Sequence, residues 1–407
     1  MTDQTKLRNE PLDYQIWGQE QIDPEAIAQM DQAMRLPVSV AGALMPDAHI
    51  GYGIPIGGVL ATDGVVIPYA VGVDIACRMR LSVFQDSPNV IGQRVEQFKK
   101  ALMEQTRFGV GRKGGEWDPR EQVDHDVLDD PDWQATKYLA SLKDTAFRQL
   151  GTSGGGNHFA NWGALTLEKD DEQLGLKAGR YLALLSHSGS RGVGYKIANH
   201  YSKLAMDLHP QLDKSVRHLA WLALGSQAGE EYWLAMQLAG RFAAANHEVI
   251  HQRIAKAMKL KPVAVVENHH NFAWKERIAS PTGYQQGERE VIVHRKGATP
   301  AGRNVLGIIP GSMADPGYVV RGQGNVASIN SAAHGAGRLM GRKEAKRSIT
   351  KTQRDRYLKE HHVILIGGGL DESPQVYKPI DSVMAAQEDL VDIVGRFEPR
   401  IVRMANE

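Results

Sequence analysis

Histidines flanked by small or amide residues are the positions in this chain best suited to chemistry. They occur in the stretches 157–158, 187–190, 269–271 and 334–338. Glycine neighbours let a ligand approach the backbone closely, and an imidazole can serve as a metal ligand or as a nucleophile. In the last stretch, His334 is followed by three small residues and then by Arg338, whose planar guanidinium suits phosphate. This pattern predicts a histidine that meets a phosphorylated ligand.

A second group of residues has the donor types of a transition-metal site. An apolar run at 70–73 leads into Asp74 and Cys77, and glycine-rich or apolar segments lead into His158, His187 and the pair at 269–270. Strand ends that converge on one place are a common way to build a site. A carboxylate, a thiolate and imidazoles would together suit Mn²⁺, Zn²⁺ or Fe²⁺, and donor softness does not choose among these ions. A thiolate can also bridge two metal ions, so a single cysteine does not limit the site to one.

Each of these features also has a purely structural interpretation. A cysteine after an apolar strand is more often a small core residue than a ligand, and a histidine at a strand end is more often simply hydrogen-bonded. The glycine-rich loop at 151–159 lacks the Gly-Lys-Ser/Thr of a P-loop, so a system of tight turns explains it equally well. In HSGSRG, by contrast, hydroxyls, backbone amides and Arg191 can all face one anion. Taken alone, Lys296 in HRKG is better explained as part of a solvated basic turn.

The composition is that of an ordinary globular protein, with 42% hydrophobic and 23% charged residues. Lys+Arg 48 and Asp+Glu 47 give a formal net charge of +1, which argues against a strongly basic nucleic-acid coat but not against a local basic groove. Because Cys77 is the only cysteine, no intramolecular disulfide can form. With no apparent signal peptide and no apolar run long enough to cross a membrane, we expect a cytoplasmic protein without a membrane span.

The elements that must hold these residues are a mixture of strands and helices. Apolar runs predict strands at 59–60, 65–75, 181–186, 262–267, 291–294, 305–309, 317–321 and 362–368. Helical spacing predicts helices at 25–36, 89–104, 133–150, within 195–259, and at 343–359 and 380–396. Residues 45–58 are rich in turn formers and poor in helix formers. The composition of 108–132 predicts a loop, which carries Arg112, Lys113 and Arg120 and could contact substrate. Since no repeat or linker interrupts the pattern, we expect an α+β fold: one large mixed α/β domain over 1–407, with central β-sheets flanked by helices and a peripheral segment at 1–24.

The motifs, taken in order, resemble those of the RtcB-type RNA-splicing ligases. The matching stretches are MPDAHIGYGIPIGG, IPYAVGVDIACRM, LGTSGGGNHF, LLSHSGSRGVG, ENHHN, HRKGAT, IIPGSM, HGAGRLMGR and YKPIDSVMAAQEDLV. The resemblance implies an enzyme that joins an RNA end bearing a 3′-phosphate or 2′,3′-cyclic phosphate to a 5′-hydroxyl end, in tRNA splicing or RNA repair. It also implies that the enzyme uses GTP and Mn²⁺ and forms a guanylated histidine. We expect two Mn²⁺ ions. The KxDG motif of lysine-dependent ligases is absent, which fits a histidine nucleophile.

The resemblance implies a role for each matching residue. The metal ligands would be Asp74, Cys77, His158, His187 and His270, the last because it directly precedes Asn271. His334 would be the nucleophile, and we expect Asp47 to orient its imidazole. The nucleotide would contact Asn157, Phe159, Asn161, Asn271, Pro310, Gly311, Ser312, Met313, Gly317, Gly335, Ala336, Gly337 and Tyr377. Phosphates and RNA would meet Arg191, Lys296, Arg338 and Arg342.

Departures from the family pattern cluster at positions implied to contact the base. Asn161 and Gly317 stand where the family usually has Glu and Ser, and Ala405 stands near the place of a C-terminal lysine. An asparagine accepts guanine's two N–H groups only in part, so we expect weaker selectivity for GTP and possible use of ATP. The alternative is a compensated pocket that still prefers GTP. Arg78 replaces a usual glycine and either contacts substrate phosphate or only fills space.

Two other functions compete with ligation. A metal-dependent RNA-end phosphatase or cyclic phosphodiesterase would keep the metal donors but form no covalent nucleotide adduct. A non-catalytic RNA-binding paralogue would be expected to have lost His334 or Cys77, and both are present. We therefore expect an RNA substrate and no membrane partner, and the sequence leaves the oligomeric state open.

Overall fold

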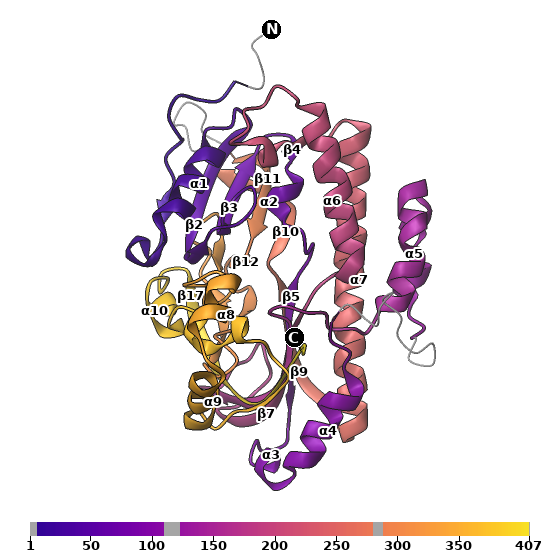
Figure 1. Cartoon of the computed structure of the whole chain (residues 1–407), viewed down its shortest axis with the longest axis vertical. Coiled ribbons are helices and arrows are strands. Elements are labelled where there is room, and N and C mark those ends of the chain that lie inside the picture. The colour runs from indigo at the N-terminus through magenta and orange to yellow at the C-terminus, as the bar shows by residue number, and fades with distance from the viewer. Residues whose placement is uncertain (1–5, 110–122, 280–287, 407) are drawn as a thin grey trace.

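A computed structural model of the chain describes residues 6–109, 123–279 and 288–406 (Figure 1). Arg112, Lys113 and Arg120 of the expected substrate-contacting loop lie outside these ranges. Two large sheets carry the fold, and helices cover their outer faces. This arrangement confirms the expected α+β class, a single mixed α/β domain with central sheets flanked by helices.

The first sheet is strongly curved and holds most of the expected site. Its main strands, in spatial order, are β13 (Leu306–Ile309), β14 (Gly317–Gly322), β17 (Val391–Met404), β6 (Phe159–Leu167), β7 (Gly179–Ser188), β5 (Arg78–Phe84) and β9 (Pro262–His269). Neighbours in this order are antiparallel, and β16 (Ile364–Ile366) pairs parallel to β17. The backbone N–H of Ile308 in β13 donates to Asn268 Oδ1 in β9 at 2.9 Å. This bond joins the two edges, so the sheet is nearly closed into a barrel.

Side chains of the curved sheet alternate between two apolar cores, as the period of two in a strand requires. One face of β5 and β7 contributes Met79, Leu81 and Leu185 to a core that also contains Phe397 from β17. The other face packs Leu182, Leu184 and Trp162 against α4 (Val95–Gln105) and α7 (Gln227–Met258). The sheet is therefore buried on both faces, and its polar groups are concentrated at its end.

The second sheet packs against both the helices and the first sheet. Its strands, in spatial order, are β1 (Gln15–Ile16), β2 (Ser39–His49), β3 (Ile56–Thr62), β11 (Glu288–Lys296) and β10 (Asn271–Ala279). Leu44 and Leu60 face a core shared with α1 (Pro24–Met34), α2 (Pro68–Val71), α6 (Arg191–Leu208) and α7. Ala43 and Val59 face the opposite way, toward β13, β14 and α10 (Ile380–Ala385). Figure 1 shows α6 and α7 running side by side along one flank of the molecule.

Short elements complete the structure. Two small ladders pair β4 (Val65–Val66) with β8 (Leu222–Ala223), and β12 (Ala298–Pro300) with β15 (Ser331–Ala333). The remaining α-helices of the described residues are α3 (Val90–Gln93), α5 (Lys137–Gln149), α8 (Arg342–Ser348) and α9 (Lys351–Glu360). Single 3₁₀ turns include Gln19–Gln21, Asp126–Asp129, Pro131–Gln134, Arg217–Leu219, Leu370–Glu372 and Pro374–Val376. In the described part of the chain, no helix is both long and apolar enough to cross a membrane.

Two expected elements were wrong. The helix expected at 380–396 ends at Ala385, and Val391–Met404 is instead strand β17 in the middle of the curved sheet. The strand expected over 65–75 is interrupted by the helical turn Pro68–Val71, because proline favours the first position of a helix. The stretch 45–58, rich in turn formers, contains the end of β2, which continues to His49, and the start of β3 at Ile56.

Candidate active site

Five side chains converge at one end of the curved sheet. Asp74 and Cys77 lie just before β5, His158 lies directly before β6, His187 lies near the end of β7, and His270 directly follows β9. Because β5 and β6 run antiparallel to β7, and β9 runs antiparallel to β5, the starts of β5 and β6 and the ends of β7 and β9 lie at the same end of the sheet. The sequence suggested that apolar strands lead into Asp74, Cys77, His187 and His270, and that the glycine-rich loop carries His158. In the structure, His187 and His270 lie at strand ends, whereas Asp74, Cys77 and His158 precede strand starts.

The donor atoms of this cluster lie within metal-ligand reach of one another. Cys77 Sγ is 3.1 Å from His187 Nε2 and 3.4 Å from His158 Nε2. His187 Nε2 is 3.2 Å from His270 Nε2, and His158 Nε2 is 3.0 Å from Asp74 Oδ2. Ligands about 2.0–2.3 Å from one ion stand roughly 3–4 Å apart. The donors form two overlapping groups, Cys77 with His187 and His270, and Cys77 with Asp74 and His158, so either group could hold a metal ion.

Hydrogen bonds aim the histidine nitrogens into the cluster. His158 Nδ1 lies 2.7 Å from the carbonyl oxygen of Ser153, and His187 Nδ1 lies 3.1 Å from that of Asn157. Because a carbonyl only accepts, each Nδ1 carries the proton and each Nε2 presents a lone pair. Burial lowers the pKa of His187 to about 3 and that of His270 well below its usual value, so both rings are neutral. Neutral imidazoles are the form that binds metals.

The thiol and the carboxylate of the cluster respond differently to their surroundings. Burial, and then the charge of Asp74, raises the pKa of the Cys77 thiol well above its usual value. Burial would also raise the pKa of Asp74, but the hydrogen bond and charge of His158 outweigh it and lower that pKa. A buried thiol next to a carboxylate can lose its proton only if a cation compensates the charge. The chemistry of this donor set therefore fits a metal ion.

The glycine-rich loop that carries His158 is fixed by a buried amide from α7. Asn246 Oδ1 accepts the backbone N–H groups of Gly151 and Thr152 at 2.7 and 3.1 Å, and its Nδ2 donates to Thr152 O at 2.9 Å. Arg191 Nε donates to Thr152 Oγ1 at 3.2 Å, and a Cβ at Gly154 would lie 2.0 Å from its Nη1. Gly154 also has φ +92°, a backbone conformation that residues with a side chain rarely adopt, so glycine is favoured at that position. In this structure Arg191 stabilises the loop.

His334 lies next to the cluster and is held by a fully buried carboxylate. Its Nδ1 is 2.6 Å from Asp47 Oδ2, and the backbone N–H groups of His334 and Gly335 donate to the same oxygen at 3.1 and 3.3 Å. The Nδ1 proton therefore points at Asp47, and Nε2 remains available to an electrophile. The ring centroid of His334 lies 4.8 Å from that of His270. Gly337, with φ +73°, passes so close to Asp47 that a Cβ would lie 2.1 Å from its carbonyl oxygen.

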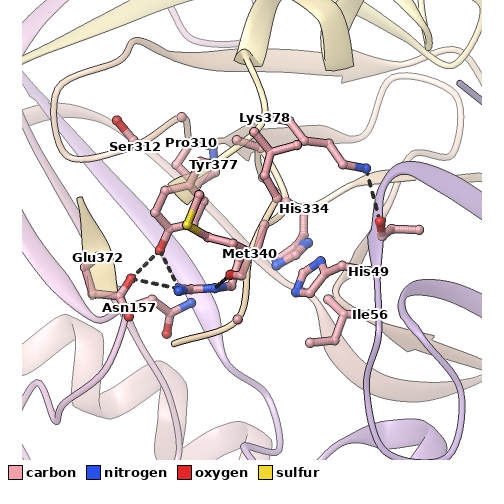
Figure 2. A pocket seen from close by; sticks show the side chains of 18 of the residues that line it. His49, Ile56, Asn157, Pro310, Ser312, His334, Met340, Glu372, Tyr377 and Lys378 are labelled. Atoms are coloured by element: carbon pink, nitrogen blue, oxygen red, sulfur yellow. Dashed lines mark hydrogen bonds and ion pairs between the residues drawn. The ribbon is translucent and has the colours of Figure 1, made fainter. Parts of the chain in front are cut away.

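His334 opens into a pocket with a volume of about 870 Å³ (Figure 2). Of the residues expected at the site, the following line it: Asn157, Phe159, His187, His270, Pro310, Gly311, Ser312, Met313, His334, Gly335, Ala336, Gly337, Arg338, Arg342 and Tyr377. The volume lies within the usual range for small-molecule sites. The N-terminal segment, expected to be peripheral, also contributes Glu20–Asp23 to the wall.

Two residues expected at the site, Asn271 and Lys296, do not line the pocket but hold neighbouring segments in place. Asn271 Nδ2 donates to Asp74 O at 3.2 Å, and its Oδ1 accepts Gly297 N–H at 2.8 Å. Lys296 is buried, which lowers its pKa to about 7, and its ammonium donates to the carbonyls of Tyr52 and Ile54. Lys296 thus anchors the 50–56 loop and does not line the pocket.

The positions expected to contact the base also lie outside the pocket wall. Asn161 is buried in β6 between Leu185 and Val402, and its Oδ1 has no hydrogen-bond partner among the described residues. Gly317 starts β14 and backs onto Pro310, where a Cβ would lie 3.1 Å from the proline Cα.

Arg78 has a structural partner. Its guanidinium is buried, forms an ion pair with Glu267 and lies 3.0 Å from His269 Nδ1. Arg78 does not line the pocket, so the structure does not support contact with substrate phosphate. Beyond filling space, Arg78 forms an internal ion pair.

Three functional candidates were missed in the sequence. His49 lines the pocket beside His334, as Figure 2 shows, and its Nδ1 lies 3.1 Å from Asp47 O. Burial lowers the pKa of His49 to about 4, so this ring is neutral. Lys378 donates to the carbonyls of Pro46 and Ala48 at 2.8 and 3.1 Å and so fixes the strand that carries Asp47. The i, i+2 spacing of Asp47 and His49 could have revealed that they share a face of one strand.

The third functional candidate that was missed in the sequence is Glu372, which binds two arginines and a tyrosine at the pocket wall. Its carboxylate accepts from Arg342 and from the hydroxyl of Tyr377, and lies 3.5 Å from Arg338. Arg338 Nη2 also donates to Asp371 O at 2.7 Å, and its Cζ lies 5.3 Å from the ring centroid of Tyr377. Glu372 is almost fully buried, so these bonds are shielded from solvent. The network holds both guanidiniums in place before any phosphate arrives.

We expect Glu372→Gln to lower the free energy of unfolding by roughly 1–3 kcal/mol, because a buried partner of two charged groups is lost. Urea denaturation followed by circular dichroism would measure the change. Glu344→Gln, on the exposed side of α8, is the matched control and should change stability by less than about 0.5 kcal/mol. Equal effects of the two variants would contradict a stabilising role for the network.

The fold and the site together define a mixed α/β protein with a candidate metal centre next to an arginine-lined pocket. A family model described as tRNA-splicing ligase RtcB matches residues 29–405. RNA-splicing ligase RtcB of Escherichia coli (strain K12) is 33% identical over 367 residues, which cover 86% of this chain and 87% of that protein. The tRNA-splicing ligase RtcB of Nanoarchaeum equitans is 31% identical over 418 residues, with 88% and 86% covered. The chain therefore belongs to the RtcB family, which confirms the resemblance seen in its motifs.

Proposed function

We propose that this protein is an Mn²⁺-dependent RNA ligase that joins a 2′,3′-cyclic-phosphate or 3′-phosphate RNA end to a 5′-hydroxyl end. The intermediate would be a nucleotidylated His334, with GTP as the expected nucleotide. The observation that carries this proposal is the pair of His334 and the buried Asp47 carboxylate, next to the five-donor cluster. Membership of the RtcB family supports the same chemistry.

In the first step, His334 Nε2 attacks the α-phosphorus of the nucleotide. An N–P bond forms, the bond from phosphorus to the β-phosphate oxygen breaks, and pyrophosphate leaves. The proton stays on Nδ1, and the Asp47 carboxylate, 2.6 Å away, stabilises the positive charge that develops on the ring. Arg338 and Arg342 line the pocket and can donate to the departing phosphates. Mn²⁺ held by Asp74, Cys77, His158, His187 and His270 would supply further compensation of phosphate charge.

The later steps transfer the nucleotidyl group and close the phosphodiester. An oxygen of the RNA 3′-phosphate attacks the phosphorus on His334, so the N–P bond breaks and the imidazole is regenerated. The 5′-hydroxyl then attacks the activated 3′-phosphorus, and the nucleoside monophosphate leaves. A cyclic phosphate must first be opened by water to a 3′-monophosphate. His334 acts twice, first as nucleophile and then as leaving group.

A ligation assay tests the proposal directly. RNA with a 2′,3′-cyclic-phosphate end and RNA with a 5′-hydroxyl end are incubated with the protein, Mn²⁺ and a nucleoside triphosphate, and joined product is measured. Product that requires both the metal and the triphosphate is the expected result. Conversion of the cyclic end without any joined product would favour the phosphatase or phosphodiesterase alternative. Binding of RNA without either change would favour a non-catalytic role.

We expect the nucleotide preference of this protein to be relaxed. Asn161 lies just outside the pocket wall, on the same face of β6 as the pocket residue Phe159. It offers an amide where a carboxylate would accept both N–H groups of guanine, and Gly317 and Ala405 have no polar side chain. A site that satisfies both groups rejects the wrong base by about 10⁴-fold, so a preference for GTP over ATP below about 100-fold is expected. Rates of covalent labelling with α-labelled GTP and ATP would measure it.

A GTP preference above about 10⁴-fold would contradict this prediction and favour a compensated pocket. The wall does contain other carboxylates, Glu20, Asp23 and Glu372, that could compensate. Asn161→Glu is the informative variant, because it restores a carboxylate and should increase the preference for GTP if Asn161 relaxes it.

A further inference from the structure

Positive charge in this near-neutral chain is concentrated in α8 and α9. Residues 342–362 contain eight Lys and Arg against three Asp and Glu, a surplus of five. The other residues contain 40 Lys and Arg against 44 Asp and Glu. The protein therefore has a local basic surface that its net charge of +1 conceals.

Most of these cations are exposed and have no acidic partner in the part of the chain that the structure describes. Lys343, Arg347, Lys351, Arg356 and Lys359 are exposed and form no ion pair within the described residues. We call these five residues the basic surface. The buried sides of the helices carry Ala345 in α8 and Leu358 in α9. The buried Arg354 of α9 differs from the exposed cations because it pairs with Asp355 and donates to Gly368 O. An uncompensated set of like charges repels itself, so an anionic ligand would stabilise it.

The basic surface begins next to the candidate active site, because Lys343 directly follows the pocket residue Arg342. Arg342 lines the pocket and is also the first residue of α8, and Figure 1 shows α8 and α9 following one another along the same side of the molecule. A groove of about 680 Å³ beside α9 is lined by Lys351, Arg354, Lys359 and His362, by the carboxylate of Asp355 and by β16. Gly367 lines this groove and Glu372 lines the pocket, so a short segment of the chain links the two hollows.

We infer that the basic surface binds the phosphate backbone of the RNA strand whose end enters the pocket. This inference rests on the proposed function. The pocket can hold only the reacting end and the nucleotide, so the rest of the strand must leave across the protein surface. On the side of Arg342, α8 is the first surface that this strand would meet. Exposed Lys and Arg side chains bind phosphates without reading sequence, which suits an enzyme that recognises RNA ends.

The test is RNA binding by a variant in which the basic surface is neutral. It combines K343Q, R347Q, K351Q, R356Q and K359Q, none of which lines the pocket. Fluorescence anisotropy with a labelled 3′-phosphate RNA, without triphosphate or metal, gives Kd as a function of salt. Each RNA phosphate that the variant fails to bind should lower the slope of log Kd against log salt by about 0.7, so a variant that binds three fewer phosphates should show a slope lower by about 2. We expect Kd at low salt to rise at least about tenfold.

A matched control neutralises five exposed lysines elsewhere. These are Lys169, Lys203, Lys214, Lys259 and Lys261. It should leave both Kd and slope close to those of the unchanged protein. Covalent labelling of His334 by α-labelled GTP is measured in parallel and should be equal in all three proteins, which shows that the variants are folded and the nucleotide site is intact.

Equal Kd and equal slope in the basic-surface variant and its control would overturn the inference. Binding of polyglutamate, lost in the variant while RNA affinity is unchanged, would also overturn it and identify an acidic protein as the ligand. If no protein is labelled by any triphosphate, the proposed ligase function fails, yet the binding comparison still decides the role of the surface. If the variant with all five substitutions does not fold, the test is repeated with the double variant K343Q/R347Q.

Discussion

Replacing His334 with alanine is expected to abolish the protein–nucleotide adduct and to lower ligation by at least about 10⁴-fold, as removal of a catalytic nucleophile does elsewhere. No neighbouring imidazole can take its place. His270 Nε2 is directed at His187 Nε2, 3.2 Å away, within the metal-donor cluster. His49 lies beside His334, but its Nδ1 faces the carbonyl of Asp47 and not a carboxylate that could stabilise positive charge. Incubation with Mn²⁺ and α-labelled GTP, followed by acid and alkali treatment, would detect an acid-labile phosphoramidate.

Asp47→Asn is the control that separates the nucleophile from its partner. The amide keeps a hydrogen-bond acceptor near His334 but removes the charge that stabilises the developing imidazolium. We expect the adduct to form about 10²- to 10⁴-fold more slowly, because loss of the carboxylate from such a pair has effects of this size. Undiminished labelling of the His334→Ala variant would show that the nucleophile is another residue.

The sequence indicated the chemistry of the site because donor side chains stand where strands begin or end. His158, His187 and His270 each adjoin a strand, and the structure brings their Nε2 atoms together. Spacing along the chain could not show that Cys77 belongs to two donor groups, because this depends on the order of β6, β7, β5 and β9 in space. Because these strands pair antiparallel, the starts of β5 and β6 lie beside the ends of β7 and β9 at one end of the sheet.

The error at the C-terminus has a physical cause. Residues 380–396 carry apolar side chains at helical spacing, yet β17 begins at Val391 and pairs with both β14 and β6. Along that strand Gly395, Phe397 and Pro399 are buried and alternate with more exposed residues, which is the period of a strand. Tertiary pairing on both sides outweighs the weak local preference for helix. The neighbours that decide it, β14 and β6, lie far away in sequence.

The residues missed at the site act through buried polar contacts that local patterns do not encode. Glu372 contacts Arg338 and Arg342, about thirty residues earlier in the chain, and Lys378 contacts carbonyls that precede it by more than three hundred residues. From sequence alone, a carboxylate or a lysine is expected to be solvent-exposed, because its buried partners are not known. Residues that hold the site in place through buried contacts are therefore harder to predict from sequence than residues that carry the reactive atoms.

Replacing Cys77 with alanine is expected to cost the protein more metal than replacing any one histidine of the cluster. Cys77 Sγ belongs to both donor groups, with His187 and His270 on one side and Asp74 and His158 on the other. We predict two bound Mn²⁺ ions in the unchanged protein. His270→Ala should retain about one, since the group of Asp74, Cys77 and His158 is untouched. Cys77→Ala should retain almost none at micromolar free metal, because loss of a ligand lowers affinity by at least about 100-fold at each site.

Metal content after gel filtration, measured by mass spectrometry, and the electron paramagnetic resonance of coupled Mn²⁺ would distinguish these outcomes. A thiolate shared by two ions predicts a coupled spectrum in the unchanged protein and an uncoupled one in His270→Ala. If Cys77→Ala and His270→Ala each lost a single ion, Cys77 would serve one ion only and the bridging role would be wrong. Because burial and the charge of Asp74 both raise the pKa of the Cys77 thiol, metal binding should also release a proton, and buffer-dependent calorimetry would detect it. Proton release retained in Cys77→Ser would assign that proton to a group other than the thiol.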